Sequence, residues 1–390
     1  MRDVAISDQA ASNEVIFESG EQSSLLVPLV WLRDHCREPS SYNHATNQRT
    51  SNMVNLFEEA VVKRKEDVEV HEQRTIHINW QNGLKSKYEI DELLKSCLNR
   101  NLPSTSEDIM AWDASWDAGI PRLNVSDFSF AEFCQLFVRY GVVIIDGVEA
   151  NAEATEKLCR EIAPIHDTYY GSFWVFSNET KDEDYHEDTA YGQQAIGPHT
   201  DGTYFEQTPG IQVFHCLTPA HEGGDTILVD GKRCVDILRV ENPAAYQLLT
   251  TKRVDHHYLE GGDDGNVLNC VGRHRPVIEV DGQGNLVQLR FNPYDRAPLK
   301  SLRYDDPASA KETLQFYKAY SRFSQICHDP VNSIRTSLQP GSVIFIDNFR
   351  VLHSRTAFKG FREMSGCYLS RDNLLAKARP HLNKDIRYAI

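Results

Sequence analysis

Hydrophobic and polar residues alternate along several short segments of this 390-residue chain, which is the pattern of half-buried β-strands. Near the N-terminus, Ile76, Ile78 and Trp80 alternate with polar residues, a hairpin turn is expected at residues 81–83, and residues 84–90 return. A short helix is expected at residues 91–98. These elements predict a small β-rich domain over residues 1–118.

The remaining residues, 119–390, are predicted to form a larger domain in which strands dominate. Strands are expected at residues 142–145, 210–217, 226–229, 342–346 and 366–369, and a hairpin at 277–291 that turns at 281–284. Apolar residues at three- and four-residue spacing predict helices at 155–165, 234–250 and 308–327, on the outside of a sheet. The predicted fold class is therefore α+β, mainly β, with a jelly-roll core (a double-stranded β-helix) and covering helices.

The boundary between the two domains is placed within residues 101–121, which contain two prolines and a cluster of Ser, Thr and Asp. The chain is acidic, with 56 Asp and Glu against 41 Lys and Arg. This charge disfavours nucleic acid and anionic membranes as partners and favours a small cationic ligand. No apolar run approaches the roughly 20 residues of a membrane-spanning helix. The first 18 residues lack the features of a signal or transit peptide, and the cysteines lack the spacing of a disulfide framework.

One group of residues carries the pattern of a redox iron site. His199 and Asp201 lie two residues apart beside a predicted strand, so both side chains can face one ion. His353, expected after the strand at 342–346 and a turn, is the candidate third ligand. Two imidazoles and one carboxylate leave three coordination positions of Fe(II) open for a cosubstrate and oxygen. The His-x-Asp pair alone is a weak signal, because this composition predicts roughly two chance matches.

Two further residues are candidates for binding 2-oxoglutarate. Arg362 follows His353 by nine residues, and its guanidinium matches the two oxygens of a carboxylate. Thr226, in the sequence GGDT at residues 223–226, offers a hydroxyl donor. Taken singly, each residue is more commonly explained as a buried histidine or a salt-bridging arginine, but the ordered set favours an iron site.

This order of motifs resembles the taurine-dioxygenase-like superfamily, and more narrowly its branch of γ-butyrobetaine and trimethyllysine dioxygenases. The narrower resemblance runs through nearly the whole chain, including WLRDHC at 31–36, YGSFW at 170–174, DTAY at 188–191 and residues 345–353. It implies Fe(II)- and 2-oxoglutarate-dependent 3-hydroxylation of Nε-trimethyllysine, the first step of carnitine biosynthesis, with ascorbate dependence and a homodimer. It also implies a mitochondrial location, whereas the acidic N-terminus favours the cytoplasm.

Both substrates of this branch carry a trimethylammonium group, which aromatic rings bind without hydrogen bonds. By the resemblance, the aromatic cage here consists of Tyr170, Trp174, Tyr191 and Tyr368. By the resemblance, the butyrobetaine enzymes carry an asparagine at the position of Asp188, whereas the trimethyllysine enzymes carry an aspartate. The negative charge of Asp188 therefore suits the α-ammonium of trimethyllysine. Asn292 is the expected partner of the substrate carboxylate. Core packing for the aromatic residues and a turn-capping role for Asp188 are the plain alternatives.

A departure from the butyrobetaine enzymes, which bind a structural zinc in the small domain, predicts that this zinc is not present here. Cys36 remains, but Glu38, Ser41 and Leu84 occupy the other matching positions, and one thiolate cannot hold a tetrahedral zinc ion. The nearest alternative function is hydroxylation of γ-butyrobetaine on the same scaffold. More distant alternatives are a non-catalytic binder of trimethylammonium ligands and a cupin-like metal protein with another substrate.

Overall fold

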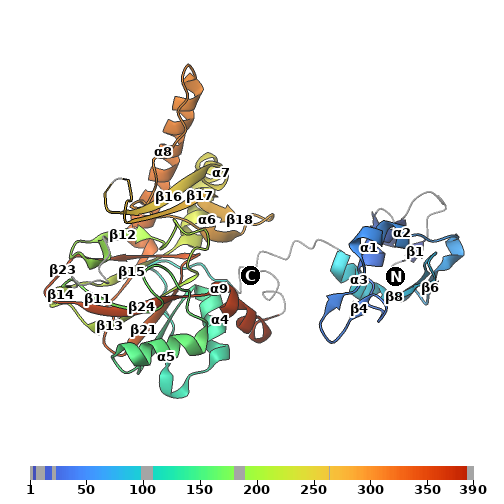
Figure 1. Cartoon of the computed structure of the whole chain (residues 1–390), viewed down its shortest axis with the longest axis horizontal. Coiled ribbons are helices and arrows are strands. Elements are labelled where there is room, and N and C mark those ends of the chain that lie inside the picture. The colour runs from blue at the N-terminus through green and yellow to red at the C-terminus, as the bar shows by residue number, and fades with distance from the viewer. Residues whose placement is uncertain are drawn as a thin grey trace. The chain divides into compact units, whose positions relative to one another are not determined.

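The computed structural model describes residues 3–5, 14–19, 23–97, 109–179, 189–262 and 264–383, and the chain forms two compact units, Met1–Asn101 and Leu102–Ile390 (Figure 1). The division thus lies before the expected position between residues 118 and 119. The reason is Trp112, which is buried in the core of the larger unit. Its backbone N–H donates a hydrogen bond to the carboxylate of Asp230 at 3.0 Å.

The smaller unit contains two antiparallel three-stranded sheets and short helices. Buried Ile76 and Ile78 alternate with less buried residues, which confirms the predicted hairpin, and the expected short helix begins one residue early. The strands are β1 (Asp3–Ala5), β2 (Glu14–Ser19), β3 (Ser23–Pro28), β4 (Tyr42–Asn43), β5 (Gln48–Arg49), β6 (Val68–His71), β7 (Thr75–Asn79) and β8 (Lys85–Glu89), and the helices are α1 (Leu29–Asp34), α2 (Leu56–Glu59) and α3 (Ile90–Cys97).

The larger unit is built on two sheets. The six-stranded sheet has the order β11 (Trp174–Ser177), β24 (Glu363–Leu369), β13 (Ile211–Thr218), β21 (Ser342–Asp347), β10 (Val142–Asp146) and β9 (Arg122–Asn124). The four-stranded sheet has the order β12 (Ile196–His199), β22 (Val351–Arg355), β15 (Thr226–Asp230) and β20 (Ser333–Thr336). Adjacent strands are antiparallel except β9 and β10. The strands predicted within these sheets are confirmed.

The side chains of β10 point alternately to the two faces of the six-stranded sheet. One face packs against helices, and the other faces the four-stranded sheet. Val143 and Ile145 join the core cluster formed with α4 (Phe130–Tyr140) and α5 (Ala152–Ile162). Val142 and Ile144 join the cluster that contains Leu228 of the smaller sheet. Because successive side chains point to opposite faces, this run of β-branched residues fills both cores.

The predicted helix at 234–250 is wrong as a single element. It is divided into α6 (Gly231–Glu241) and α7 (Pro243–Thr251), because Pro243 cannot continue a helix and Asn242 caps the next one. The predicted helices corresponding to α5 and α8 (Pro307–His328) are confirmed. Helix α4 was not predicted, and neither was α9 (Arg371–Ala378). Helices α6, α7 and α8 pack together, and part of α8 projects beyond the sheets (Figure 1).

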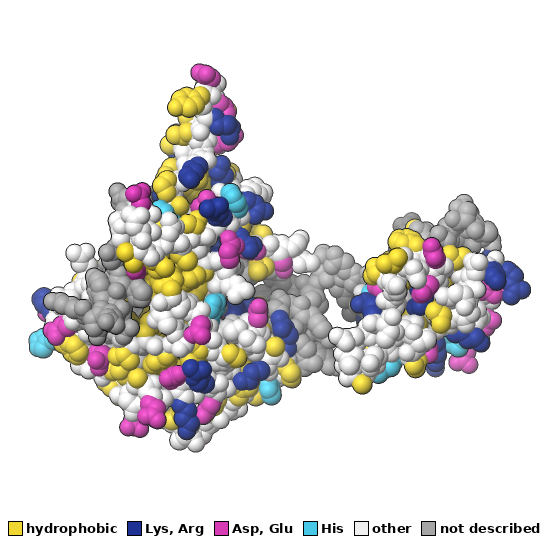
Figure 2. Space-filling view, in the orientation of Figure 1, with side chains coloured by type: hydrophobic (Ala, Val, Ile, Leu, Met, Phe, Trp, Pro, Cys, Tyr) yellow, Lys and Arg dark blue, Asp and Glu magenta, His cyan; other side chains and the backbone are white. Residues whose placement is uncertain are grey.

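Two hairpins complete the larger unit. The predicted hairpin is formed by β18 (Ile278–Val280) and β19 (Leu286–Leu289), and an unpredicted one by β16 (Arg253–Glu260) and β17 (Leu268–Pro276). Strands β14 (Glu222–Gly223) and β23 (Phe358–Lys359) form a short pair. Among the described residues, no helix is both long and apolar enough to cross a membrane. Figure 2 shows acidic and basic side chains interspersed on the visible face, with hydrophobic side chains along the projecting helix.

Candidate active site

A cavity of about 380 Å³ lies in the larger unit and is lined by residues of both sheets. This volume is in the range of small-molecule sites. Ten of the eleven predicted site residues line it: His199, Asp201, His353, Arg362, Thr226, Tyr170, Trp174, Tyr191, Asn292 and Tyr368. Asp188 lies outside the described residues.

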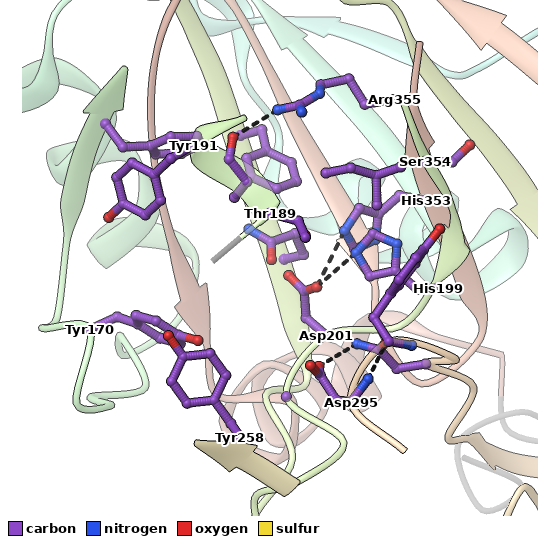
Figure 3. Close-up of a pocket in the computed structure, with 18 of the residues that line it drawn as sticks. Tyr170, Thr189, Tyr191, His199, Asp201, Tyr258, Asp295, His353, Ser354 and Arg355 are labelled. Atoms are coloured by element: carbon purple, nitrogen blue, oxygen red, sulfur yellow. Dashed lines mark hydrogen bonds and ion pairs between the residues drawn. The ribbon is translucent and has the colours of Figure 1, made fainter. Parts of the chain in front are cut away.

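The three predicted metal ligands meet on the smaller sheet. His199 ends β12 and pairs with His353 of the antiparallel strand β22, and Asp201 follows two residues after His199. His353 therefore lies within a strand and not, as expected, beyond the end of one. Asp201 Oδ1 is 3.2 Å from His199 Nε2 and 3.5 Å from His353 Nε2, and one donor atom from each residue lies within 4.8 Å of the others (Figure 3).

Hydrogen bonds hold these side chains in place. His199 Nδ1 is 2.8 Å from the carbonyl of Gly197, to which it donates, and this hydrogen bond leaves Nε2 facing the other two candidate ligands. The fully buried amide of Asn348 accepts the N–H of Asp201 and donates to the carbonyls of Asp201 and Pro209. The hydroxyl of Tyr368 donates to Asp201 Oδ2 at 3.1 Å.

The carboxylate of Asp201 is held ionised between the two histidines. Burial raises the pKa of Asp201, but the charges and hydrogen bonds of the two histidines outweigh it and bring the pKa well below its usual range. Burial lowers the pKa of His353. Burial also lowers the pKa of His199, but Asp201, the carbonyl of Gly197 and the charge of Asp295 raise it overall. An ionised carboxylate between two imidazoles is the donor set of a non-haem Fe(II) site, so the residues fit this metal.

Arg362 provides a buried positive charge in the same cavity, and only 9% of its surface is exposed. Within the described ranges, its guanidinium has no hydrogen-bond acceptor or carboxylate partner and instead lies over the ring of Phe358. Burial lowers its pKa. A buried cation without an anion is costly, so this position favours an anionic ligand. Thr226, at the start of β15, lines the same cavity.

The predicted cage residues line the cavity in separate ring pairs. Trp174 meets Tyr368 edge-on at 5.4 Å between ring centroids, and Tyr191 pairs with Phe176 at 5.8 Å. Tyr170 lies against Tyr258, at 5.9 Å, on the side of the view in Figure 3 opposite the metal ligands.

Sequence reasoning missed Tyr258, Tyr204, Phe176 and Phe214, which also line the cavity. The hydroxyl groups of Tyr170 and Tyr204 are 2.8 Å apart. In the structure, burial alternates along β16 and places Tyr258 on the buried face of the strand.

Asn292 contacts its own loop rather than pointing freely into the cavity. Its Oδ1 accepts the backbone N–H groups of Tyr294 and Asp295, and its Nδ2 donates to Asp295 Oδ2 at 2.6 Å. The amide thereby fixes the carboxylate of Asp295, a cavity residue that was not predicted.

Arg355 fixes another part of the wall. Its guanidinium donates to the carbonyl groups of Ala190, Gly192 and Gln194, at 2.6–3.0 Å. These carbonyls lie on both sides of Tyr191, so Arg355 positions the segment that carries this ring. The sequence pattern offered no signal for this contact, which joins residues about 160 positions apart.

The sequence profile of the Taurine catabolism dioxygenase TauD, TfdA family matches residues 102–368, and the chain belongs to this family. The trimethyllysine dioxygenase of Gallus gallus is 35% identical over 90% of this chain and 82% of its own length. The mitochondrial trimethyllysine dioxygenase of Rattus norvegicus is 34% identical over 90% of this chain and 81% of its own length. The γ-butyrobetaine dioxygenase of Pongo abelii is 25% identical over 95% of both chains. The resemblance seen in the sequence motifs is confirmed.

Proposed function

We propose that this protein is an Fe(II)- and 2-oxoglutarate-dependent dioxygenase that hydroxylates Nε-trimethyllysine at C3, in the first step of carnitine biosynthesis. The observation that carries the proposal is the joint placement of the His199, Asp201 and His353 donor atoms and the buried Arg362 in one cavity. The relatives named trimethyllysine dioxygenase support the choice of substrate. We also propose that the two sheets that enclose this cavity form a jelly roll.

His199, Asp201 and His353 would hold the iron, and Arg362 with Thr226 would bind the C5 carboxylate of 2-oxoglutarate. Bound iron and 2-oxoglutarate supply the oxidative chemistry, in which O2 is consumed, 2-oxoglutarate becomes succinate and CO2, and one oxygen atom enters a C–H bond. The protein contributes orientation: the Arg362 guanidinium matches a carboxylate with two donors, and its buried surroundings exclude water.

Tyr170, Trp174, Tyr191 and Tyr368 are proposed to receive the trimethylammonium group through their ring faces. Tyr368 contacts both regions, because its ring meets Trp174 and its hydroxyl donates to Asp201. This link supports a position of the cationic group near the iron ligands. Asp188 remains the family-based proposal for the substrate ammonium, and Asn292 for its carboxylate.

γ-Butyrobetaine hydroxylation is the second candidate function. It is favoured by the match to γ-butyrobetaine dioxygenase over nearly the full length of both chains. The two substrates share the trimethylammonium group, so the aromatic residues do not distinguish them. The higher identity to trimethyllysine dioxygenases favours the first candidate.

Further proposals concern the small unit and the cellular setting. The thiol of Cys36 accepts a hydrogen bond from Ser86, and the Ser41 hydroxyl accepts one from Arg33. These contacts support the proposal that hydrogen bonds, and not a zinc ion, stabilise this part of the small unit. Stoichiometric zinc in a metal analysis would contradict the proposal. Ascorbate dependence, the homodimer and a mitochondrial location remain proposals from the resemblance, with the cytoplasm as the alternative location.

The test is succinate formation by iron-loaded protein with 2-oxoglutarate and oxygen, with Nε-trimethyllysine and γ-butyrobetaine supplied separately. Stimulation by trimethyllysine alone, or far more strongly than by butyrobetaine, is expected. Stimulation by butyrobetaine alone would retain the iron chemistry and overturn the proposed substrate. No stimulation by either would overturn both candidate functions.

A further inference from the structure

The cavity contains a second carboxylate, that of Asp295, besides the proposed metal ligand Asp201. Figure 3 shows both side chains among the residues that surround the cavity. Asp295 belongs to the loop after β19, whereas Asp201 follows β12. Asp295 is neither a proposed iron ligand nor a proposed contact of 2-oxoglutarate, although its charge raises the pKa of His199.

The Asp295 carboxylate is held in a defined position. Its Oδ2 accepts a hydrogen bond from Asn292 Nδ2, and its backbone N–H donates to Asn292 Oδ1. Its backbone carbonyl accepts the N–H of His257 at 2.8 Å, and the next residue, Arg296, forms an isolated bridge with His256 of β16. Binding groups that are fixed in advance lose little conformational entropy when a ligand binds.

The other charged groups of the cavity have separate roles. Asp201 lies between the two imidazoles, and Arg355 donates to three backbone carbonyls. The guanidinium of Arg362 is the proposed binding group for the C5 carboxylate of 2-oxoglutarate. Asp295 contributes a negative charge to the same cavity, beside the amide of Asn292.

The Asn292–Asp295 pair presents the chemistry that an α-amino acid requires. The Asn292 amide has two N–H groups, of which one is given to Asp295, and the second is a donor for a carboxylate. The Asp295 carboxylate is an acceptor for an ammonium group. Nε-Trimethyllysine has both an α-ammonium and a carboxylate, whereas γ-butyrobetaine has only the carboxylate, which Asp295 would repel.

We infer that Asp295 binds the α-ammonium group of the substrate, in addition to the family-based candidate Asp188, and that the Asn292–Asp295 pair makes the enzyme select a trimethylated amino acid over γ-butyrobetaine. This inference rests on the proposed function and deepens it. It assigns a specificity-determining role to a residue that lies three positions after the expected carboxylate partner.

The experiment uses the Asp295→Asn variant, which removes the charge but keeps an oxygen that can accept the hydrogen bond of Asn292. Asp255→Asn is the matched control, because Asp255 lies on the adjoining strand β16 and its carboxylate accepts the N–H of His274 outside the cavity. The two substrates are Nε-trimethyllysine and 6-(trimethylammonio)hexanoate, which is the same molecule without the α-ammonium.

For Asp295→Asn, kcat/KM with trimethyllysine should fall roughly 10- to 100-fold, while kcat/KM with the analogue stays the same or rises. The Asp255→Asn control should keep the preference of the wild-type enzyme for trimethyllysine, and Asp295→Glu should restore part of it. An equal loss with both substrates would indicate a structural role and overturn the inference, as would an unchanged preference. If the wild-type enzyme turned over neither substrate, the proposed function itself would fail.

Discussion

The metal-binding end of the cavity and its aromatic end are constructed differently. At the metal end, His199 and His353 are paired residues of adjacent antiparallel strands, and the buried Asn348 fixes the backbone of Asp201. At the aromatic end, Tyr170 comes from a loop, and it contacts Tyr258 of the β16 hairpin. The two histidines of the metal end thus lie on neighbouring strands of one sheet, whereas the rings of the aromatic end come from separate elements: Trp174 from β11, Tyr368 from β24 and Tyr170 from a loop.

This difference leads to an order of expected effects. Loss of a metal ligand should abolish the reaction, because no neighbouring side chain replaces a donor atom fixed by strand pairing. Loss of a single ring should weaken substrate binding only in part, because several rings share the contact.

His353→Ala should lower the turnover of 2-oxoglutarate at least about 1,000-fold, because two remaining ligands do not hold the iron in its open geometry. Succinate formation and the iron content of the purified protein provide the measurements. His71→Ala, in the smaller unit, is the control and should be fully active, since its ring lies at the surface. Substantial activity of His353→Ala would show that the assignment of the ligands is wrong.

Arg362→Lys should raise the KM for 2-oxoglutarate roughly 10- to 100-fold, because an ammonium group lacks the paired donors of a guanidinium. Steady-state kinetics with varied 2-oxoglutarate measure this effect. Arg335→Lys is the matched control, because Arg335 is largely exposed and pairs with Asp225. An unchanged KM in Arg362→Lys would remove the cosubstrate role of this residue.

Trp174→Leu should raise the KM for Nε-trimethyllysine roughly tenfold, since a leucine lacks the ring face that attracts a cation. The KM for 2-oxoglutarate should change little. The comparison uses a neutral substrate analogue in which a tert-butyl group replaces the trimethylammonium group. If the variant lost affinity for both molecules equally, Trp174 would contribute packing and not cation recognition.

A histidine outside the cavity gives the smallest effect on activity. His215 is fully buried, and its Nε2 accepts the N–H of Gly341 while Nδ1 lies 2.8 Å from the hydroxyl of Thr155. Burial lowers its pKa from 6.5 to about 4. Because the folded protein binds this proton more weakly than the unfolded chain, the stabilisation by neutral His215 is present above pH 6.5 and is lost as the pH falls to about 4.

The loss should amount to about 3 kcal/mol of the free energy of unfolding across this range. Urea unfolding of the wild-type protein and His215→Gln at a series of pH values measures it. The difference in stability between the two proteins should shrink as the pH falls, while activity at neutral pH stays similar. A difference that is independent of pH would contradict this assignment of the protonation state.

Much of the site was predictable because strands have a period of two. His199 and Asp201 were placed on one side by this spacing, and the apolar run of β10 was correctly predicted as a strand. The break between α6 and α7 was missed, although Asn242 and Pro243 are typical of a helix start.

Other features depend on contacts between distant segments. Asp295 enters the cavity because its loop pairs with β16, and nothing in the local sequence indicates that pairing. The position of His353 within β22 likewise follows from pairing with β12 and β15. Local patterns predict elements, but only the packed sheets decide which loop residues reach the cavity.

The most direct test of the central claim is mass spectrometry of the product formed from an equal mixture of Nε-trimethyllysine and γ-butyrobetaine under isotopically labelled oxygen gas. We predict that labelled 3-hydroxytrimethyllysine accumulates together with succinate, while most of the butyrobetaine remains. Labelled carnitine as the main product, or labelled succinate without any labelled hydroxylated substrate, would contradict this assignment.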